Sequence, residues 1–171
     1  MAFIGVIANS KYETEIKKVL DDRLNHKIKE HTVIAINDKS IDNIKNIKFE
    51  TILVMDLEEV KDKEECISKL FESTKYLVIN SDMESSLEAI NNMKLNIITF
   101  GFNSKSTITA SSVEENFLIC LQRNIINVDG KTIEPQEFKF EIFDKKLLSR
   151  HHNLMGIASI LLIYGKSEIF F

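Results

Sequence analysis

The chain has 171 residues, which is enough for one domain with a sizeable hydrophobic core. Its 44% apolar and 28% charged residues are ordinary for a globular protein, and a net charge of −4 without a basic stripe argues against a nucleic-acid partner. The longest apolar run, 154–164, is shorter than the roughly 20 residues of a membrane-spanning helix, so the sequence predicts no membrane partner either.

The cysteines and the amino terminus favour a cytoplasmic protein. Cys66 and Cys120 lie inside apolar segments without metal-ligand spacing, which indicates buried free thiols in a reducing compartment. Residues 1–5 have no basic region before their apolar part and predict a strand rather than a secretion signal. With one proline and five glycines there is no obvious linker, so we expect a single domain over 1–171.

In chain order, the first elements predict a strand, a turn, a helix and two more strands. Residues 3–8 are an apolar run typical of a buried parallel strand, and 32–36 and 51–55 repeat this pattern. A polar turn follows the first strand, and Ser10 with Glu13 has the capping-box spacing that begins a helix. Apolar side chains at helical spacing form the buried face of this helix: Tyr12, Ile16, Val19 and Leu20.

The next segment predicts a helix followed by the clearest βαβ unit in the chain. The helix covers 62–73, the strands of the unit cover 76–79 and 96–100, and Ser81 with Glu84 has the spacing that begins a second helix between them. Such a unit closes right-handed, with its loops at the carboxyl ends of the strands, where open α/β sheets bind ligands. The apolar faces of the two helices are Cys66, Ile67, Leu70 and Phe71 in the first and Leu87, Ile90 and Met93 in the second.

The pattern then changes to antiparallel β-structure. Residues 108–114 and 117–122 predict strands, and the alternation over 138–143 predicts a half-buried strand. Between them an apolar run ends in Asp129-Gly130, which predicts a hairpin with a type I′ turn.

The carboxy-terminal helix predicted over 153–164 is apolar on nearly all sides, which indicates deep burial. The whole pattern predicts an α/β fold of the P-loop or Rossmann-like kind: a mostly parallel sheet flanked by helices, with a small antiparallel β subsheet. The parallel part is expected over 1–101, the antiparallel subsheet over 102–148, and the last helix with its tail over 149–171.

Short motifs in the second half of the chain, in their order and spacing, resemble the central domain of the Mur ligase family. Asn80 and Asp82 match its Asn-Ala-Asp-Asp turn, 99–101 match its Thr-Phe-Gly strand end, and His152-Asn153 match the Gly-x-His-Asn that opens an Ala-rich helix. The family consists of ATP-dependent enzymes that add amino acids to the peptidoglycan precursor. The resemblance implies the same central-domain fold, which has an antiparallel subsheet at this place.

The resemblance also implies a nucleotide site. Its residues would be Asn9, Ser10 and Lys11 in the first βα turn, with His152 and Asn153 at the start of the last helix, where the family's asparagine contacts adenine. An asparagine amide can do this because it both donates and accepts hydrogen bonds. Judged from the residues alone, Asn153 is equally well a helix cap and the histidines a polar loop, and these alternatives remain open.

The first βα turn departs from the family's phosphate-binding loop, Gly-Thr-x-Gly-Lys-Thr. Lys11 is kept, but both glycines are missing, the loop is one residue short, and Tyr12 and Glu13 follow the lysine. Glycines let successive backbone N–H groups curl around phosphates, and a hydroxyl after the lysine holds Mg²⁺. The turn is therefore also typical of an ordinary capped strand–turn–helix, although a helix amino terminus still attracts anions.

The magnesium-binding elements of the family have no clear match, so the metal ligands stay unknown. Asn37 and Asp38 stand near the position of a metal-binding glutamate, and Glu58 and Glu59 near that of a histidine. The same acidic, lysine-rich stretch is typical of a solvated loop. Where several family members have a carbamylated lysine, this chain has Ile67. We assign no catalytic residue.

We therefore expect a Mur-ligase-like domain with degenerate catalysis that retains weak nucleotide or phosphate binding, with ATP and Mg²⁺ as the implied cofactors. Two alternatives remain open: a structural or interaction module without a nucleotide site, and an active amide ligase that works with partner domains. The family's flanking domains have no counterpart in the sequence. The apolar last helix and the tail at 169–171 indicate a covered interface, for which we expect a homodimer or a cell-wall synthesis protein as partner.

Overall fold

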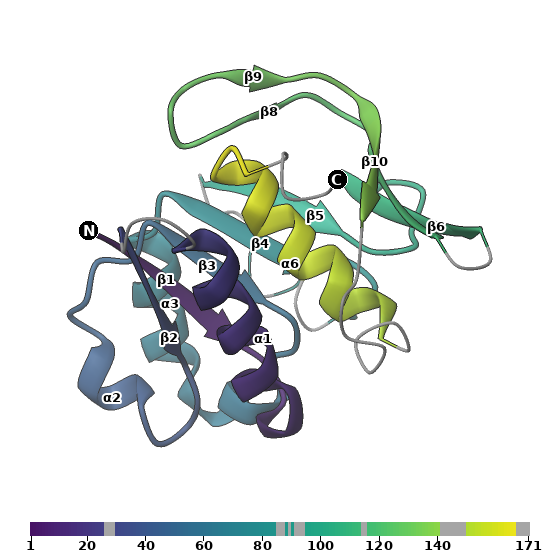
Figure 1. The fold of residues 1–171 in the computed structure, drawn as a ribbon. Coiled ribbons are helices and arrows are strands. Elements are labelled where there is room, and N and C mark those ends of the chain that lie inside the picture. Colours follow the sequence, from purple (N-terminus) through teal and green to yellow (C-terminus); the bar gives the residue numbers. More distant parts are fainter. Residues whose placement is uncertain are drawn as a thin grey trace.

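The computed structural model describes residues 1–25, 30–84, 88, 90, 95–113, 116–140 and 150–166. They form an α/β fold in which one mixed sheet is flanked by helices on both faces, so the predicted fold class is confirmed (Figure 1). The strands of this sheet are β1 (Ala2–Ile7), β2 (His31–Ala35), β3 (Thr51–Val54), β4 (Tyr76–Asn80), β5 (Asn96–Phe100), β6 (Ile108–Val113), β7 (Asn116–Leu121) and β10 (Gln136–Phe140).

The eight strands lie in the order β10-β7-β6-β5-β4-β3-β1-β2. Neighbouring strands from β2 to β6 are parallel, whereas β7 pairs antiparallel with β6, and β10 with β7. The antiparallel strands predicted in the second half of the chain therefore extend the main sheet. A small separate sheet is formed by the hairpin of β8 (Ile125–Ile126) and β9 (Thr132–Ile133).

Strand β1 is the point at which the strand order reverses. The chain moves from β1 to β2 on one side and then returns to β3 on the other side of β1. In an open sheet of this kind, the loops after the two strands diverge and leave a crevice at their carboxyl ends, where ligands bind. The topology therefore points to the residues that follow β1 and β3.

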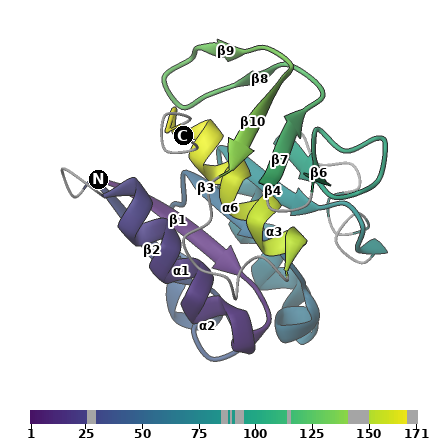
Figure 2. The same ribbon diagram turned by 45° about the vertical axis from the view of Figure 1, so that its right-hand side comes forward.

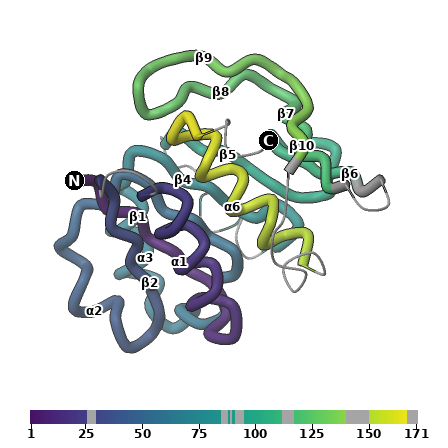
Figure 3. Tube along the Cα trace, viewed as in Figure 1, coloured from purple at the N-terminus to yellow at the C-terminus, as the bar shows by residue number. Residues whose placement is uncertain are grey.

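Helices α1 (Ser10–Leu24) and α6 (His151–Ile163) lie side by side on one face of the sheet (Figures 2 and 3). The other face packs against α2 (Ile41–Ile44), the 3₁₀-helix η1 (Glu58–Lys63) and α3 (Glu64–Glu72). Alternate residues of β1 contribute to the two cores. Ile4 and Val6 pack in the core that contains α1 and α6, and Ile7 in the core that contains α3.

Helix α6 is buried along almost its whole length, as its apolar sequence predicts. Residues 153–163 are all buried. The β8–β9 hairpin arches over the carboxyl end of the helix, where the Val128 N–H donates to the Ile163 carbonyl (2.9 Å; Figure 1). Gly165 then has a φ of +64°, the left-handed conformation that commonly ends a helix.

Helix starts differ from the prediction. Asn9 caps α1, because its Oδ1 accepts from the Lys11 N–H (3.1 Å), so the predicted Ser10–Glu13 capping box is wrong. Asparagine is favoured at this position because its short amide reaches the free N–H groups of the first turn. The helix predicted over 62–73 is divided into η1 and α3, and the prediction did not include the short α2.

The hairpin forms where the sequence predicts it, but its turn is not type I′. The Gly130 N–H donates to the Asn127 carbonyl (3.0 Å), so Val128 and Asp129 are the central residues of the turn. Gly130 follows them with a φ of +77°, which is the arrangement of a hairpin with a glycine bulge.

Some further expectations are corrected or lie outside the described residues. Cys66 and Cys120 are free but half-buried rather than buried, since each sulfur reaches a carboxylate at the protein surface. The helix predicted after Ser81 and the tail at 169–171 fall largely or wholly on residues that are not described. In the described part of the chain, no helix combines the length and the apolar character needed to cross a bilayer.

A buried histidine begins strand β2. His31 is 9% exposed, packs edge-on against Tyr164 with ring centroids 4.8 Å apart, and has no partner for Nδ1 among the described residues. Burial lowers the pKa of His31 more than the nearby Glu30 raises it. The neutral imidazole is therefore the form that the folded chain favours.

We expect this histidine to make the fold less stable in mild acid. Below about pH 6.5 the unfolded chain takes up a proton on His31 that the folded chain resists, so the free energy of unfolding falls as the pH is lowered. Thermal unfolding of the wild type and of His31→Phe at about pH 7.5 and about pH 5.5 measures this effect. The melting temperature of the variant should fall less on acidification than that of the wild type. An equal fall in the two proteins would contradict the prediction.

Candidate functional site

A cleft opens at the carboxyl ends of β1, β3 and β4, beside the point where the strand order reverses. Its volume is about 410 Å³, within the range of roughly 300–1,000 Å³ that is typical of small-molecule pockets. The first turn of α6 forms one side of it. The residues that line the cleft are Ala8, Asn9, Tyr12, Met55, Asp56, Asn80, Asp82, Met83, Arg150, His152 and Asn153.

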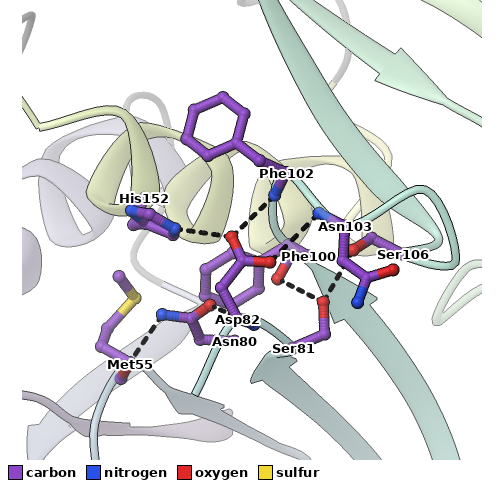
Figure 4. A network of polar contacts seen from close by, with 9 residues as sticks. All are labelled: Met55, Asn80, Ser81, Asp82, Phe100, Phe102, Asn103, Ser106 and His152. Atoms are coloured by element: carbon purple, nitrogen blue, oxygen red, sulfur yellow. Dashed lines mark hydrogen bonds and ion pairs between the residues drawn. The ribbon is translucent and has the colours of Figure 1, made fainter. Parts of the chain in front are cut away.

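The carboxylate of Asp82 joins three parts of the chain at this cleft (Figure 4). Its oxygens accept from the backbone N–H groups of Phe102 (2.7 Å) and Asn103 (3.1 Å), and His152 Nε2 lies 2.8 Å from Oδ2. Burial alone would raise the pKa of Asp82, but these partners lower it overall. The carboxylate is thus ionised at neutral pH and ties the turn after β4 to the loop after β5 and to α6.

The neighbours of Asp82 hold the turn that carries it. Asn80 is buried, its Nδ2 donates to the Met55 carbonyl (3.3 Å), and its Oδ1 accepts from the Asp82 N–H (3.1 Å). The Ser81 hydroxyl donates to the Phe100 carbonyl (3.1 Å; Figure 4). Both polar atoms of Asn80 are therefore used in shaping the turn.

Gly101 lacks a side chain where Asp82 needs the space. A Cβ built on Gly101 would lie 2.7–2.8 Å from the carboxyl atoms of Asp82, and the residue has a φ of +156°. Real Cβ atoms essentially never approach other atoms so closely. A glycine therefore follows strand β5 because the carboxylate of Asp82 packs directly against the backbone there.

Asn153 provides an amide with an unused donor at the wall of the cleft. Helix α6 begins at His151, earlier than predicted, so Asn153 lies within the first turn and the helix-cap interpretation is wrong. The side chain is 7% exposed, and its Nδ2 has no hydrogen-bond partner among the described residues. An unpaired buried donor costs about 1–3 kcal/mol, and because Nδ2 is itself closed off from solvent, a ligand in the cleft would reach it only after the side chain turns.

The two histidines before Asn153 belong to α6 and are held by aromatic rings, so the polar-loop interpretation is also wrong. Phe102 lies edge-on to His151 and His152, with ring centroids 5.9 and 5.2 Å away (Figure 4 shows the ring beside His152). His151 also stacks on Phe117 at 5.4 Å. These contacts fix the orientation in which His152 meets Asp82.

The charged side chains at the cleft leave no unpaired cation among the described lining residues. Asp56 and Asp82 supply two carboxylates. His152 bonds to Asp82, and Arg150 forms an ion pair with Glu15 (2.9 Å). The cleft therefore offers an anionic ligand little electrostatic attraction.

The first turn of α1, where the resemblance places a nucleotide phosphate, is closed by the chain itself. The Ser10 N–H donates to Glu59 Oε1 (3.3 Å). The N–H groups of Lys11 and Tyr12 donate to the side chain and the carbonyl of Asn9, at 3.1 and 2.8 Å. This turn does not fit a triphosphate, because a phosphate would have to displace a carboxylate and a capping amide.

Three of the five residues predicted for a nucleotide site lie together. Asn9, His152 and Asn153 line the cleft from opposite sides. Ser10 and Lys11 are exposed, and they are not among the described residues that line it. Two residues of the predicted phosphate-binding turn, Ser10 and Lys11, thus lie outside the cleft, whereas the third, Asn9, lines it together with His152 and Asn153.

Tyr12, Asp56 and Arg150 are among the lining residues that the sequence did not predict for the site. The Arg150 guanidinium lies 4.0 Å from the centre of the Tyr12 ring, and Asp56 is the second residue after strand β3. The position of Asp56 at a strand end was a usable signal. Tyr12 gave none, because its helical spacing indicates a core residue, and it is in fact partly buried against the core.

Three of the four residues considered for Mg²⁺ have other contacts. Asn37 Oδ1 accepts from the Lys39 N–H (3.1 Å), Glu58 pairs with Lys61, and Glu59 bonds to the first turn of α1. Within the ranges that the structure describes, no three His, Cys, Asp or Glu side chains are placed to hold a metal ion. The contacts of Asn37, Glu58 and Glu59 do not fit the magnesium sites that the resemblance implies.

A scan against protein-family models finds no family that matches this chain, and a search of curated proteins finds no match either. The likeness to the Mur ligase family therefore remains a prediction from the motifs at 80–82, 99–101 and 152–153.

Replacing Gly101 by alanine should destabilise the fold by about 2 kcal/mol or more, because the new Cβ displaces the Asp82 carboxylate from its donors. Urea unfolding monitored by circular dichroism measures the loss. Gly130→Ala is the matched control: its φ is +77° but nothing lies within 4 Å of the new Cβ, so only a backbone cost of about 1 kcal/mol is expected. If Gly101→Ala lowers the free energy of unfolding no more than Gly130→Ala does, the close approach of Asp82 to Gly101 does not contribute to stability.

Proposed function

We propose that this chain is a Mur-ligase-like domain that binds a nucleoside or nucleotide by its base and carries out no phosphoryl transfer. The observation that carries the proposal is the buried, unpaired amide of Asn153 in a cleft at the carboxyl ends of parallel strands. Open α/β sheets bind ligands at this place, and an acceptor on a ligand would complete the hydrogen bonding of the amide.

The cleft suits a flat ring with polar edges. Ala8, Met55 and Met83 give it apolar surface. An asparagine amide offers a donor beside an acceptor, which matches the donor–acceptor edge of adenine. Rotation about the Cβ–Cγ bond exchanges the two polar atoms of Asn153, so that the unused donor can be presented to the ligand.

The proposal excludes turnover because phosphoryl transfer needs a phosphate cradle and Mg²⁺ held in position. The N–H groups of the first turn of α1 already have acceptors within the chain, and Glu58 and Glu59 have other partners. By the resemblance, such a domain would regulate or scaffold cell-wall synthesis in the cytoplasm. The free thiols of Cys66 and Cys120 are in keeping with that compartment.

Asn153→Leu should abolish ligand binding while raising the free energy of unfolding by about 1 kcal/mol. The leucine removes an unpaired buried amide and keeps a similar volume, so binding and stability change in opposite directions. Equilibrium dialysis with adenosine, AMP and ATP at millimolar concentration measures binding, and urea unfolding measures stability. Phosphate release from ATP should stay at the level without protein.

Asn80→Leu is the matched control, because both polar atoms of this second buried asparagine are hydrogen-bonded. It should lose about 1–3 kcal/mol of stability, since the Met55 carbonyl and the Asp82 N–H become unpaired. If the wild type binds none of the three compounds, the chain is better described as a structural or interaction module. ATP turnover would instead favour the active ligase.

A further inference from the structure

We propose that the cleft selects against phosphate: it takes an uncharged nucleoside and discriminates against the corresponding nucleoside triphosphate. This inference rests on the proposed function and names the class of ligand within it. It departs from what the resemblance implies, because the likeness alone would predict ATP. Three features of the cleft support it: the closed amino terminus of α1, the surrounding charges and the neutral groups that remain for the base.

The phosphate position is occupied by a carboxylate of the chain. Glu59, carried by η1, lies with Oε1 3.3 Å from the Ser10 N–H at the start of α1. A helix amino terminus attracts anions through such N–H groups, and here the anion is supplied internally. The Lys11 and Tyr12 N–H groups are likewise bonded to Asn9, so the turn offers a phosphate no free donors from Ser10 to Tyr12.

The charge around the cleft acts in the same direction. Asp56 and Asp82 line it, and Glu59 flanks it at the start of α1. Arg150, which lines it in the described part of the chain, is paired with Glu15, and His152 bonds to Asp82. Lys11 is not among the lining residues, although its Nζ lies 5.5 Å from the centre of the Tyr12 ring. A triphosphate would therefore enter a site of excess negative charge, whereas a nucleoside would not.

The groups that remain available are neutral. Asn153 lines the cleft with an uncharged amide, whose buried Nδ2 becomes available when the side chain turns, and the side chains of Ala8, Met55 and Met83 are apolar. Tyr12 adds an aromatic ring, one face of which is covered by the guanidinium of Arg150. A base and a sugar can contact all of these groups, and none of the groups binds a phosphate.

The test compares the affinities of the full chain for adenosine and ATP, by isothermal titration calorimetry, with EDTA and again with excess Mg²⁺. Adenosine should bind about tenfold or more tightly than ATP in both conditions. ATP binding as tight as adenosine, or tighter, would overturn the inference and leave the proposed function standing. Binding of neither compound at millimolar concentration would overturn both, so the two failures are distinguishable.

Glu59→Gln tests the mechanism of discrimination. The variant keeps an oxygen that accepts from the Ser10 N–H and removes only the charge, so the preference for adenosine over ATP should shrink by about threefold to tenfold, through the ATP affinity alone. Glu58→Gln is the matched control: it changes the net charge equally, but Glu58 pairs with Lys61 at the surface, and the preference should stay at its wild-type value. Equal preferences in wild type and Glu59→Gln would overturn the assignment of Glu59.

Discussion

The cleft depends on one carboxylate, that of Asp82, which brings three separate segments to the same point. It bonds the backbone after β5 at Phe102 and Asn103 and the start of α6 at His152, while its own N–H is held by Asn80 (Figure 4). Hydrogen bonds to an ionised acceptor contribute about 1.5–3 kcal/mol each, enough to offset the partial burial of the charge. Because the Asp82 carboxylate lies so close to the backbone after β5, there is no room for a side chain at Gly101.

The burial of α6 explains why the unpaired amide of Asn153 is energetically costly. The helix packs against the sheet and α1, and the β8–β9 hairpin covers its carboxyl end, so its side chains have little access to water. In such surroundings Asn153 cannot satisfy its amide with solvent, whereas Ser159 on the same helix bonds the Met155 carbonyl at 2.7 Å. Folded proteins satisfy nearly all buried polar groups, and exceptions are concentrated where a ligand or a strained function requires them.

Much of the fold could be predicted from the sequence because buried parallel strands have a simple pattern. The run at 96–100 coincides with β5, and the other apolar runs lie within a residue or two of β1 to β4. Contacts between distant parts of the chain could not be predicted: Ser10 bonds Glu59, and Arg150 pairs with Glu15, 135 positions away. For the candidate site, the ends of the predicted strands indicated where residues would meet. They did not indicate which hydrogen-bond donors there would already have an acceptor within the chain.

The first turn of α1 is closed to phosphate and the neighbouring cleft is open, and both depend on where backbone and side-chain N–H groups find acceptors. A helix amino terminus has N–H groups that need acceptors, and a glycine-rich loop leaves them for phosphates. Here the loop has no glycine, and Asn9 and Glu59 provide the acceptors instead. Breaking two such bonds would cost a phosphate roughly 1–3 kcal/mol before it met the repulsion of a carboxylate. The unused donor lies instead at Asn153, on the other side of the cleft, so the arrangement favours recognition of a base over recognition of its phosphates.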